Sequence, residues 1–272
     1  METGQAETKQ IQCKPGNMLG IYDIFSLEKV EKLYGELLEK GASFHRMKEL
    51  NGLKNGIILR HDFDTEMDSA LPFARMEHGL NIKSSYYFLL TARSYNLYSE
   101  HCRNILREVI SLGHEIGLHF DASIYPNDRL EEAFLEEKGL LEVITMQEMY
   151  SMSLHDPAQD GTYPYFNNIV NAYNWNIFSS KNYFSDSGFS FKATADQIIT
   201  EAEHDIVQML LHPTIYCIRN EEEPPSVIYL YKTEIERFAD ALFEPVRQHP
   251  YFVGEFRNYP ESHLNIKIKI RD

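Results

Sequence analysis

Residues 56–64 read GIILRHDFD. A run of one glycine and three apolar residues, 56–59, leads directly into a segment with four ionisable side chains, those of Arg60, His61, Asp62 and Asp64. A buried strand usually ends in a turn of small or polar residues rather than in a cluster of charges. The cluster therefore indicates a functional site at the end of this strand.

Three other apolar runs also end in a histidine: EIGLH (115–119), SMSLH (151–155) and QMLLH (208–212). In parallel α/β sheets the carboxyl ends of the strands lie at one edge, where ligands bind. We therefore expect His61, His119, His155 and His212 to lie near one another. For any one of them, a half-exposed ring packed at a strand end is the alternative. The remaining histidines, His114 among them, are expected on the surface.

Predicted strands and helices alternate from residue 26 to at least residue 213. Helical periodicity covers 26–40, 66–78, 99–112 and 128–145, and extended patterns cover 56–61, 83–90, 115–119, 150–155, 182–187 and 205–213. Such alternation is typical of an α/β protein with a parallel sheet, open or closed into a barrel. Asp128 and Glu131 have the spacing of a capping box. Farther along, a helix is expected from Thr233 and an edge strand over 263–270.

The chain has 272 residues, the length of one large α/β domain or two small ones, and no linker-like stretch marks a boundary. We predict a single domain over 1–272, with an N-terminal tail over 1–20 and a C-terminal extension over 214–272. A formal net charge of -15 argues against nucleic acid as a partner. The sequence does not indicate an oligomeric state.

The expected compartment is the cytoplasm. No apolar run approaches the roughly 20 residues that a membrane span needs, and the polar N-terminus lacks the apolar core of a signal peptide. The three cysteines are widely spaced without a CxxC pair, as in a protein with reduced thiols.

Asp62 and Asp64 carry the first chemical indication. Residues i and i+2 of a strand point to the same side, so the two carboxylates repel each other unless a cation lies beside them. A divalent metal would relieve this repulsion. One carboxylate would bind the ion, and the other would accept a proton from water whose pKa the ion brings to about 7. A solvated acidic turn, or an ion pair of Asp62 with Arg60, is the alternative.

These strand ends resemble the motifs of a known family. RHDFD (60–64), GHEIGLHFD (113–121) and LLHP (210–213) are similar in order and spacing to motifs of the polysaccharide deacetylases with NodB homology, carbohydrate esterase family 4. The first motif resembles that of a divergent branch, Arg-His-Asp-x-Asp. The resemblance covers roughly residues 56–213. It implies a distorted (β/α) barrel, usually seven-stranded, and metal-dependent removal of N- or O-acetyl groups from sugars, most often with zinc.

The resemblance also implies roles for individual residues. Asp62 would match the catalytic base and Asp64 the metal-binding carboxylate. His119 would match the first metal-binding histidine, and His212 the general acid on the leaving amine. Asp186 lies where a later acidic motif would fall, and would orient His212 or bind a sugar hydroxyl.

The chain departs from the family pattern at two points. The second metal-binding histidine is replaced by Ser123. We expect His155 to substitute for it as the third ligand, with Asp121 or His61 as alternatives. The family's arginine-proline motif is also not evident, and Arg60 is expected to supply the positive charge near the catalytic base.

These observations predict a hydrolase that acts on the C–N bond of an N-acetylated sugar or surface-glycan precursor. Two alternatives remain open: other metal-assisted amide chemistry on a sugar derivative, and a metal-free protein that binds a glycan or a protein. Zinc is the expected metal, although a His/His/Asp ligand set also suits cobalt, manganese and iron. Tyr163 and Tyr165 suit sugar stacking and core packing equally well.

Overall fold

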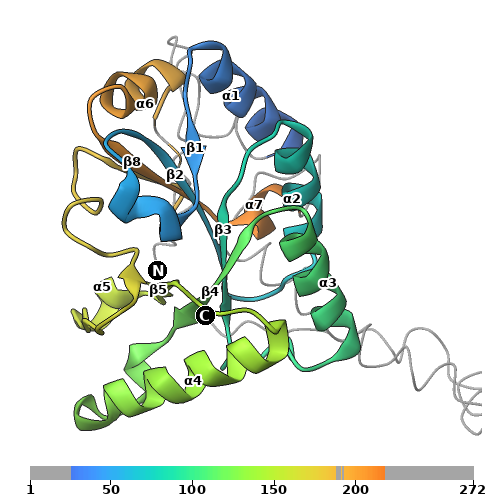
Figure 1. The fold of residues 1–272 in the computed structure, drawn as a ribbon, viewed down its shortest axis with the longest axis vertical. Helices are drawn as coiled ribbons and strands as arrows, with labels where there is room; N and C mark the ends of the chain where they lie inside the picture. The colour runs from blue at the N-terminus through green and yellow to red at the C-terminus, as the bar shows by residue number, and fades with distance from the viewer. Residues whose placement is uncertain (1–25, 188–190, 192, 218–272) are drawn as a thin grey trace, which may run out of the picture.

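The computed structural model describes residues 26–187, 191 and 193–217. Within these ranges, strands and helices alternate around a curved parallel sheet (Figure 1). The tail expected over 1–20, the helix expected from Thr233 and the strand expected over 263–270 lie outside the described residues.

The sheet is parallel at every described pairing. Its strands run in the order β6-β5-β4-β3-β2-β8-β7, and β1 pairs with β2 outside this path. The bounds are β1 Phe44–His45, β2 Gly56–Phe63, β3 Ser85–Leu89, β4 Glu115–Phe120, β5 Ser151–Leu154, β6 Val170–Asn171, β7 Tyr183–Ser185 and β8 Ile206–Leu211. Because β6 and β7 are not paired with each other among the described residues, the barrel is open on this side. The predicted fold class, a distorted (β/α) barrel, is confirmed.

All helices except the short α5 cover the outer face of this sheet. Their bounds are α1 Leu27–Glu39, α2 Ala70–Gly79, α3 Glu100–Ser111, α4 Leu130–Thr145, α5 Pro157–Asp160, α6 Ala195–Ala202 and α7 Pro213–Cys217, with short 3-10 turns at Met47–Gly52, Ala122–Ile124 and Asn127–Arg129. Contacts link α6 to α1, α1 to α2, α2 to α3 and α3 to α4. In Figure 1, α1, α2 and α3 follow one side of the sheet and α4 lies across its lower end. Within the described ranges, no helix is long and apolar enough to cross a membrane.

Two helix starts differ from the prediction. The α2 helix begins at Ala70 rather than at residue 66. This start places Pro72 in the first turn, where a missing N–H costs nothing. The capping box expected at Asp128 and Glu131 is wrong. The N-cap of α4 is Arg129, whose side chain makes no capping hydrogen bond, because a 3-10 turn precedes the helix.

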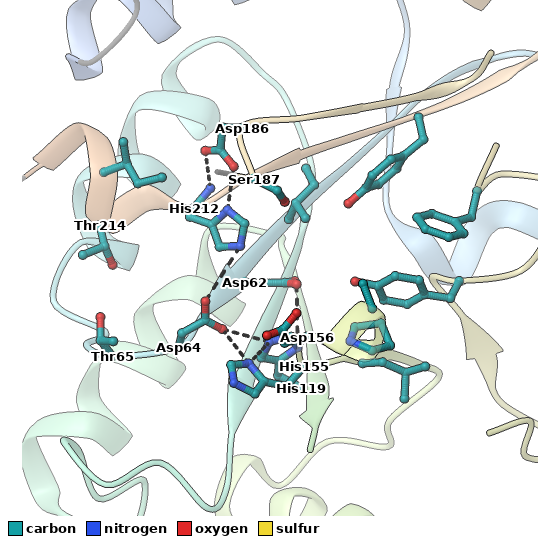
Figure 2. Close-up of a pocket in the computed structure, with 18 of the residues that line it drawn as sticks. Asp62, Asp64, Thr65, His119, His155, Asp156, Asp186, Ser187, His212 and Thr214 are labelled. Carbon is teal, nitrogen blue, oxygen red and sulfur yellow. Dashed lines mark hydrogen bonds and ion pairs between the residues drawn. The ribbon is translucent and has the colours of Figure 1, made fainter. Parts of the chain in front are cut away.

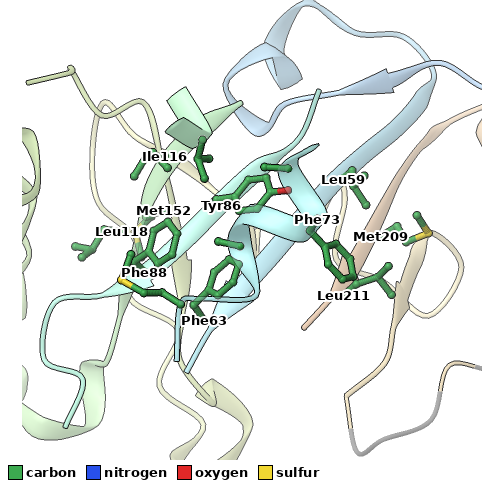
Figure 3. Packing of buried hydrophobic residues seen from close by; sticks show 14 of the residues in the cluster. Leu59, Phe63, Phe73, Tyr86, Phe88, Ile116, Leu118, Met152, Met209 and Leu211 are labelled. Carbon is green, nitrogen blue, oxygen red and sulfur yellow. The ribbon is translucent and has the colours of Figure 1, made fainter. Parts of the chain in front are cut away.

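The two faces of the sheet differ in polarity because side chains alternate along each strand. The outer face is apolar and packs against the helices. Figure 3 shows Phe63 from β2, Phe88 from β3, Leu118 from β4 and Met152 from β5 in this layer. The inner face carries buried polar side chains: Arg60, Asp62, Ser85, Glu115, His119, Ser151, Ser153 and Gln208. The sheet therefore holds a polar interior that leads to the strand ends.

One carboxylate interrupts the apolar outer layer. Glu77 on α2 is fully buried, and it accepts hydrogen bonds from His61 Nε2 (2.6 Å), Ser84 Oγ (2.5 Å) and Tyr86 OH (2.7 Å). His114 lies beside this group and is buried, so its expected surface position is wrong. The physical reason is its place directly before β4, where its Nδ1 accepts the backbone N–H of Ser84 (3.3 Å).

Candidate active site

A cavity of about 500 Å³ opens at the carboxyl ends of β2, β4, β5 and β8 (Figure 2). Six residues that the sequence predicts for the site line this cavity: Asp62, Asp64, His119, His155, Asp186 and His212. Arg60 is buried behind it. The six residues come from segments that are far apart in the chain. The parallel order of the strands brings them together.

Asp64, His119 and His155 form a compact trio. Asp64 Oδ1 lies 2.9 Å from His119 Nε2 and 3.1 Å from His155 Nδ1. The two ring nitrogens are 3.2 Å apart, and the rings are nearly perpendicular. His119 is buried, whereas the other two side chains are about one third exposed and face the cavity. The trio therefore has one side open to a ligand.

The chemistry of these atoms fits a cation. A carboxylate only accepts hydrogen bonds, and each imidazole nitrogen offers either a hydrogen or a lone pair. If both facing nitrogens carried hydrogens, these would repel each other, and a nitrogen without one would turn its lone pair toward the carboxylate of Asp64. A single divalent ion bound by all three atoms removes both conflicts. The spacings are also close to the edge of a zinc tetrahedron, about 3.3 Å for bonds of about 2.0–2.1 Å.

The charge of Asp64 agrees with this. Burial disfavours the charge of Asp64, but hydrogen bonds from His119 and His155 hold the pKa of its carboxyl well below the usual range. Burial also disfavours the charged form of His155, but Asp64 outweighs burial and raises the pKa of His155, and a bound cation would take the place of this proton. Asp64 is therefore ionised at neutral pH, as a metal ligand must be.

Arg60 holds Asp62 in a bidentate ion pair. Arg60 Nε lies 2.9 Å from Asp62 Oδ1, and Nη2 lies 2.5 Å from Oδ2. The guanidinium also donates to Gln208 Oε1 and packs over the ring of Tyr173, 4.8 Å from its centroid. Burial opposes the charge of Asp62, but Arg60 lowers the pKa of this carboxyl below its ordinary value. The positive charge expected near Asp62 is thus in direct contact with it.

His212 is oriented by Asp186. Its Nδ1 lies 2.5 Å from Asp186 Oδ1, and its backbone N–H donates to the other oxygen (2.8 Å). Burial disfavours the imidazolium form, but Asp186 outweighs it and raises the pKa of His212 to about 9. The opposite nitrogen, Nε2, points toward Asp64 Oδ2 at 3.9 Å, as Figure 2 shows. His212 can therefore present a proton to the cavity at neutral pH.

The alternative third ligands lie elsewhere. The His61 side chain points to the outer face, where Nε2 meets Glu77 and Nδ1 lies 3.1 Å from the carbonyl oxygen of Leu211. Asp121 caps the 3-10 turn after β4 by accepting from Ser123. Neither residue lines the cavity. His155 is the one that the structure places beside Asp64 and His119.

One polar contact of the site and most of one cavity wall were not predicted from the sequence. Ser153 contacts both Asp62 and His119, and strand alternation with His155 would have placed it on the same face. The aromatic wall comes from the segment that follows β5 and from the first residue of β7. It consists of Tyr163, Tyr173, Phe178 and Tyr183, with successive ring centroids 4.7–5.8 Å apart. The many aromatic residues in this irregular segment are the feature of the sequence that could have predicted the wall.

No protein-family model matches the chain, and no curated protein does. Solved structures give matches. The chain is similar to carbohydrate esterase family 4 structures. One is a CE4 family pseudoenzyme from Bacillus anthracis, with 11% identity and a TM-score of 0.41 over 69% of this chain and 62% of that chain. The chain thus spans less than two thirds of that protein.

Two further matches are deacetylases. A mutant of the peptidoglycan deacetylase PdaC from Bacillus subtilis has 12% identity and a TM-score of 0.41, over 76% of this chain and 98% of that chain. The chitin deacetylase of Colletotrichum lindemuthianum has 11% identity and a TM-score of 0.38, over 67% and 81%. Identities this low concern the fold, and the chemistry of this chain depends on its own residues.

Proposed function

We propose that the protein is a metal-dependent hydrolase that removes an N-acetyl or O-acetyl group from a sugar. One observation supports this most strongly: three groups of side chains with complementary chemistry surround one cavity. These groups are the Asp62–Arg60 pair, the trio of Asp64, His119 and His155, and the His212–Asp186 pair.

Asp64, His119 and His155 would hold a divalent ion, with zinc as the expected metal. When bound, the ion supplies a Lewis acid that polarises the acetyl carbonyl and lowers the pKa of the attacking water to about 7. Two nitrogens and one carboxylate oxygen leave a further position open on the cavity side, as in catalytic zinc sites.

Asp62 acts as the general base. Arg60 keeps its carboxylate ionised, so that it can accept the proton of the attacking water. The same ion pair makes Asp62 a weak base, and such a base suffices only for an acidified water. The low pKa of Asp62 therefore supports metal-dependent rather than metal-independent hydrolysis.

His212 acts as the general acid. Its Nε2 proton passes to the nitrogen of the acetamido group as the C–N bond breaks, which releases acetate and a free amine. Asp186 holds Nδ1, so Nε2 is the nitrogen that faces the reaction. After the reaction, His212 regains a proton and Asp62 loses one, so the net change is the addition of water.

The cavity lining favours a substrate without phosphate near the acetyl group. Within the described residues, the lining contains no lysine or arginine, and four of its side chains are carboxylates, those of Asp62, Asp64, Asp156 and Asp186. The lining therefore offers no guanidinium or ammonium group that could bind a phosphate. The aromatic wall offers ring faces on which the apolar face of a sugar can pack. An N-acetylated amino sugar, free or within a glycan precursor, has these properties.

Acetate release tests the proposal. We expect zinc-loaded protein to release acetate from N-acetylglucosamine or its oligomers, and chelation to abolish the reaction. Asp62→Asn and His212→Asn should each lower kcat by about 10²- to 10⁴-fold. The control Asp121→Asn changes an acidic residue outside the cavity and should keep full activity. Zinc-loaded protein that releases no acetate from N- or O-acetylated sugars would refute the proposal.

A further inference from the structure

The hydroxyl of Ser153 lies where the two halves of the site meet. Ser153 is fully buried on β5, directly opposite His119 on β4. Its Oγ lies 2.6 Å from Arg60 Nη2, 3.0 Å from His119 Nδ1 and 3.1 Å from Asp62 Oδ2. It is therefore in hydrogen-bond contact with the proposed base, with the arginine that holds this base, and with a proposed metal ligand.

The hydrogens of this group can be counted. A serine hydroxyl has one hydrogen and two acceptor lone pairs. Arg60 only donates, so it occupies one lone pair. Asp62 is a carboxylate and only accepts, whereas His119 Nδ1 can do either. The single hydroxyl hydrogen of Ser153 therefore points to Asp62 or to His119.

The two choices correspond to different tautomers of His119. If Ser153 donates to Asp62, its remaining lone pair accepts from His119 Nδ1–H, and Nε2 keeps a lone pair directed at Asp64 and His155. If Ser153 donates to Nδ1, the ring hydrogen lies on Nε2 and bonds Asp64 Oδ1, 2.9 Å away. The ring carries one hydrogen in both arrangements. Only the first leaves Nε2 able to bind a cation.

We propose that Ser153 is a positioning residue that couples the metal-binding tautomer of His119 to the hydrogen bonding of Asp62. The proposal rests on the metal site of the proposed function. A cation on Nε2 selects the Nδ1–H tautomer, and this hydrogen turns the hydroxyl of Ser153 toward Asp62. The base thus gains a hydrogen bond, in addition to those from Arg60, when the trio is loaded. In return, Asp62 raises the affinity of the trio for the metal through its hydrogen bond with Ser153.

Zinc affinity, measured by competition with a chromogenic chelator, tests this coupling without any need for turnover. We expect Ser153→Ala to weaken zinc binding by about 10- to 100-fold, the usual effect of losing a partner of a metal-binding histidine. Ser151→Ala is the matched control. Ser151 lies on the same strand and face, but it bonds Glu115 and Tyr87, away from the trio. Its loss should change zinc affinity by less than about twofold.

A double-mutant cycle separates coupling from simple loss of structure. Asp62→Asn should weaken zinc binding about three- to tenfold in the wild-type background, and much less in the Ser153→Ala background, because the link is already broken. In ¹⁵N spectra of the zinc-loaded wild type, the Nδ1–H of His119 should show the signature of a hydrogen bond, and Ser153→Ala should remove it. Neither result is expected if the Ser153 side chain only fills space in the core.

The outcomes are distinguishable. If the wild type binds zinc and Ser153→Ala binds it equally well, the role of Ser153 is refuted while the metal site stands. Equal effects of Asp62→Asn in both backgrounds also refute the coupling. If the wild type itself binds no zinc, the metal site and this inference fail together. Should Ser153→Ala not fold, an unchanged zinc affinity in Asp62→Asn alone would overturn the inference.

Discussion

The protonation of the His212 imidazole depends on Asp186. Burial disfavours the imidazolium, and the adjacent carboxylate reverses this and raises the pKa to about 9. In Asp186→Asn this support is lost, so we expect the pKa of His212 to fall. Because the proton donor must be charged, the decline of kcat/KM at high pH should begin at a lower pH than in the wild type. The rate at pH 8 should fall by about tenfold or more.

The measurement is kcat/KM for acetate release as a function of pH. Ser185→Ala, one residue before Asp186 and outside the proposed chemistry, should leave the profile in place. An alkaline decline at the same pH in Asp186→Asn and the wild type would show that His212 is not the proton donor.

Site residues that lie in a recognisable sequence motif could be predicted individually. Asp62, Asp64, His119 and His155 follow apolar runs, and position alone predicted their convergence. Ser153 has no such mark, because a serine in a strand is ordinary and its importance comes from its neighbours. His61 was expected near the other three strand-end histidines, and this prediction is wrong. Strand alternation turns its ring away from Asp62 and Asp64 and toward Glu77.

The strand β4 packs so closely at Gly117 that a side chain does not fit there. Gly117 lies on β4 in the GHEIGLH motif, and a Cβ there would come within 2.3 Å of the Tyr87 ring and 2.8 Å of the Ser151 carbonyl oxygen. We expect Gly117→Ala to lower the free energy of unfolding by about 1–3 kcal/mol through overpacking. Urea denaturation measures this change.

Gly139 provides the matched control. It lies within α4, where a Cβ would meet nothing within 4 Å. Gly139→Ala should raise the free energy of unfolding by about 0.5–1 kcal/mol, because alanine loses less entropy in a helix. Equal effects of the two substitutions would contradict the close contact at β4.

Glu137 on α4 makes stability depend on pH. Burial raises the pKa of its carboxyl to about 7, and Tyr125 donates to Oε1 (2.6 Å) while Oε2 has no partner among the described residues. The folded protein therefore binds this proton more tightly than the unfolded chain does. The resulting stability is complete below about pH 4.5 and is lost as the pH rises to about 7.

Glu137→Gln removes this ionisation. We expect the variant to be more stable than the wild type at pH 8, by about 1–2 kcal/mol, and nearly equal to it at pH 5. Thermal unfolding at the two pH values tests this, with the exposed Glu136→Gln as control. A variant with the same difference from the wild type at both pH values would exclude a raised pKa at Glu137.

Helices and strands with a clear hydrophobic periodicity were predicted well from the sequence, and the shortest strands were not. The long helices and the strands β2, β3, β4, β5 and β8 follow apolar periodicity in the sequence. The strands β1 and β6 have two residues each, too few for a pattern, and their place is set by pairing with β2 and β5. The edges of the sheet, and with them the open barrel, therefore depend on long-range contacts.

At the scale of the whole molecule, the buried group around Glu77 joins the outer helices to the site. His61 bonds both Glu77 on α2 and the carbonyl oxygen of Leu211, the residue before His212. We expect His61→Ala to lower the free energy of unfolding by about 3 kcal/mol, because Glu77 would lose a donor that burial prevents water from replacing.

The exposed pair of Arg129 and Glu132 gives the comparison. Surface ion pairs contribute about 0–1 kcal/mol, so Glu132→Ala should have little effect. Guanidinium denaturation of both variants measures the difference. A His61→Ala variant as stable as Glu132→Ala would show that the buried group does not support the fold.

Metal content, measured by mass spectrometry on purified protein after zinc loading and desalting, tests directly whether Asp64, His119 and His155 bind a metal ion. We expect about one zinc per chain in the wild type and in Asp121→Ala, and loss of zinc in Asp64→Ala, His119→Ala and His155→Ala. Zinc retained by His155→Ala would contradict the assigned third ligand. A wild-type protein without stoichiometric metal would contradict the metal-dependent hydrolase as a whole.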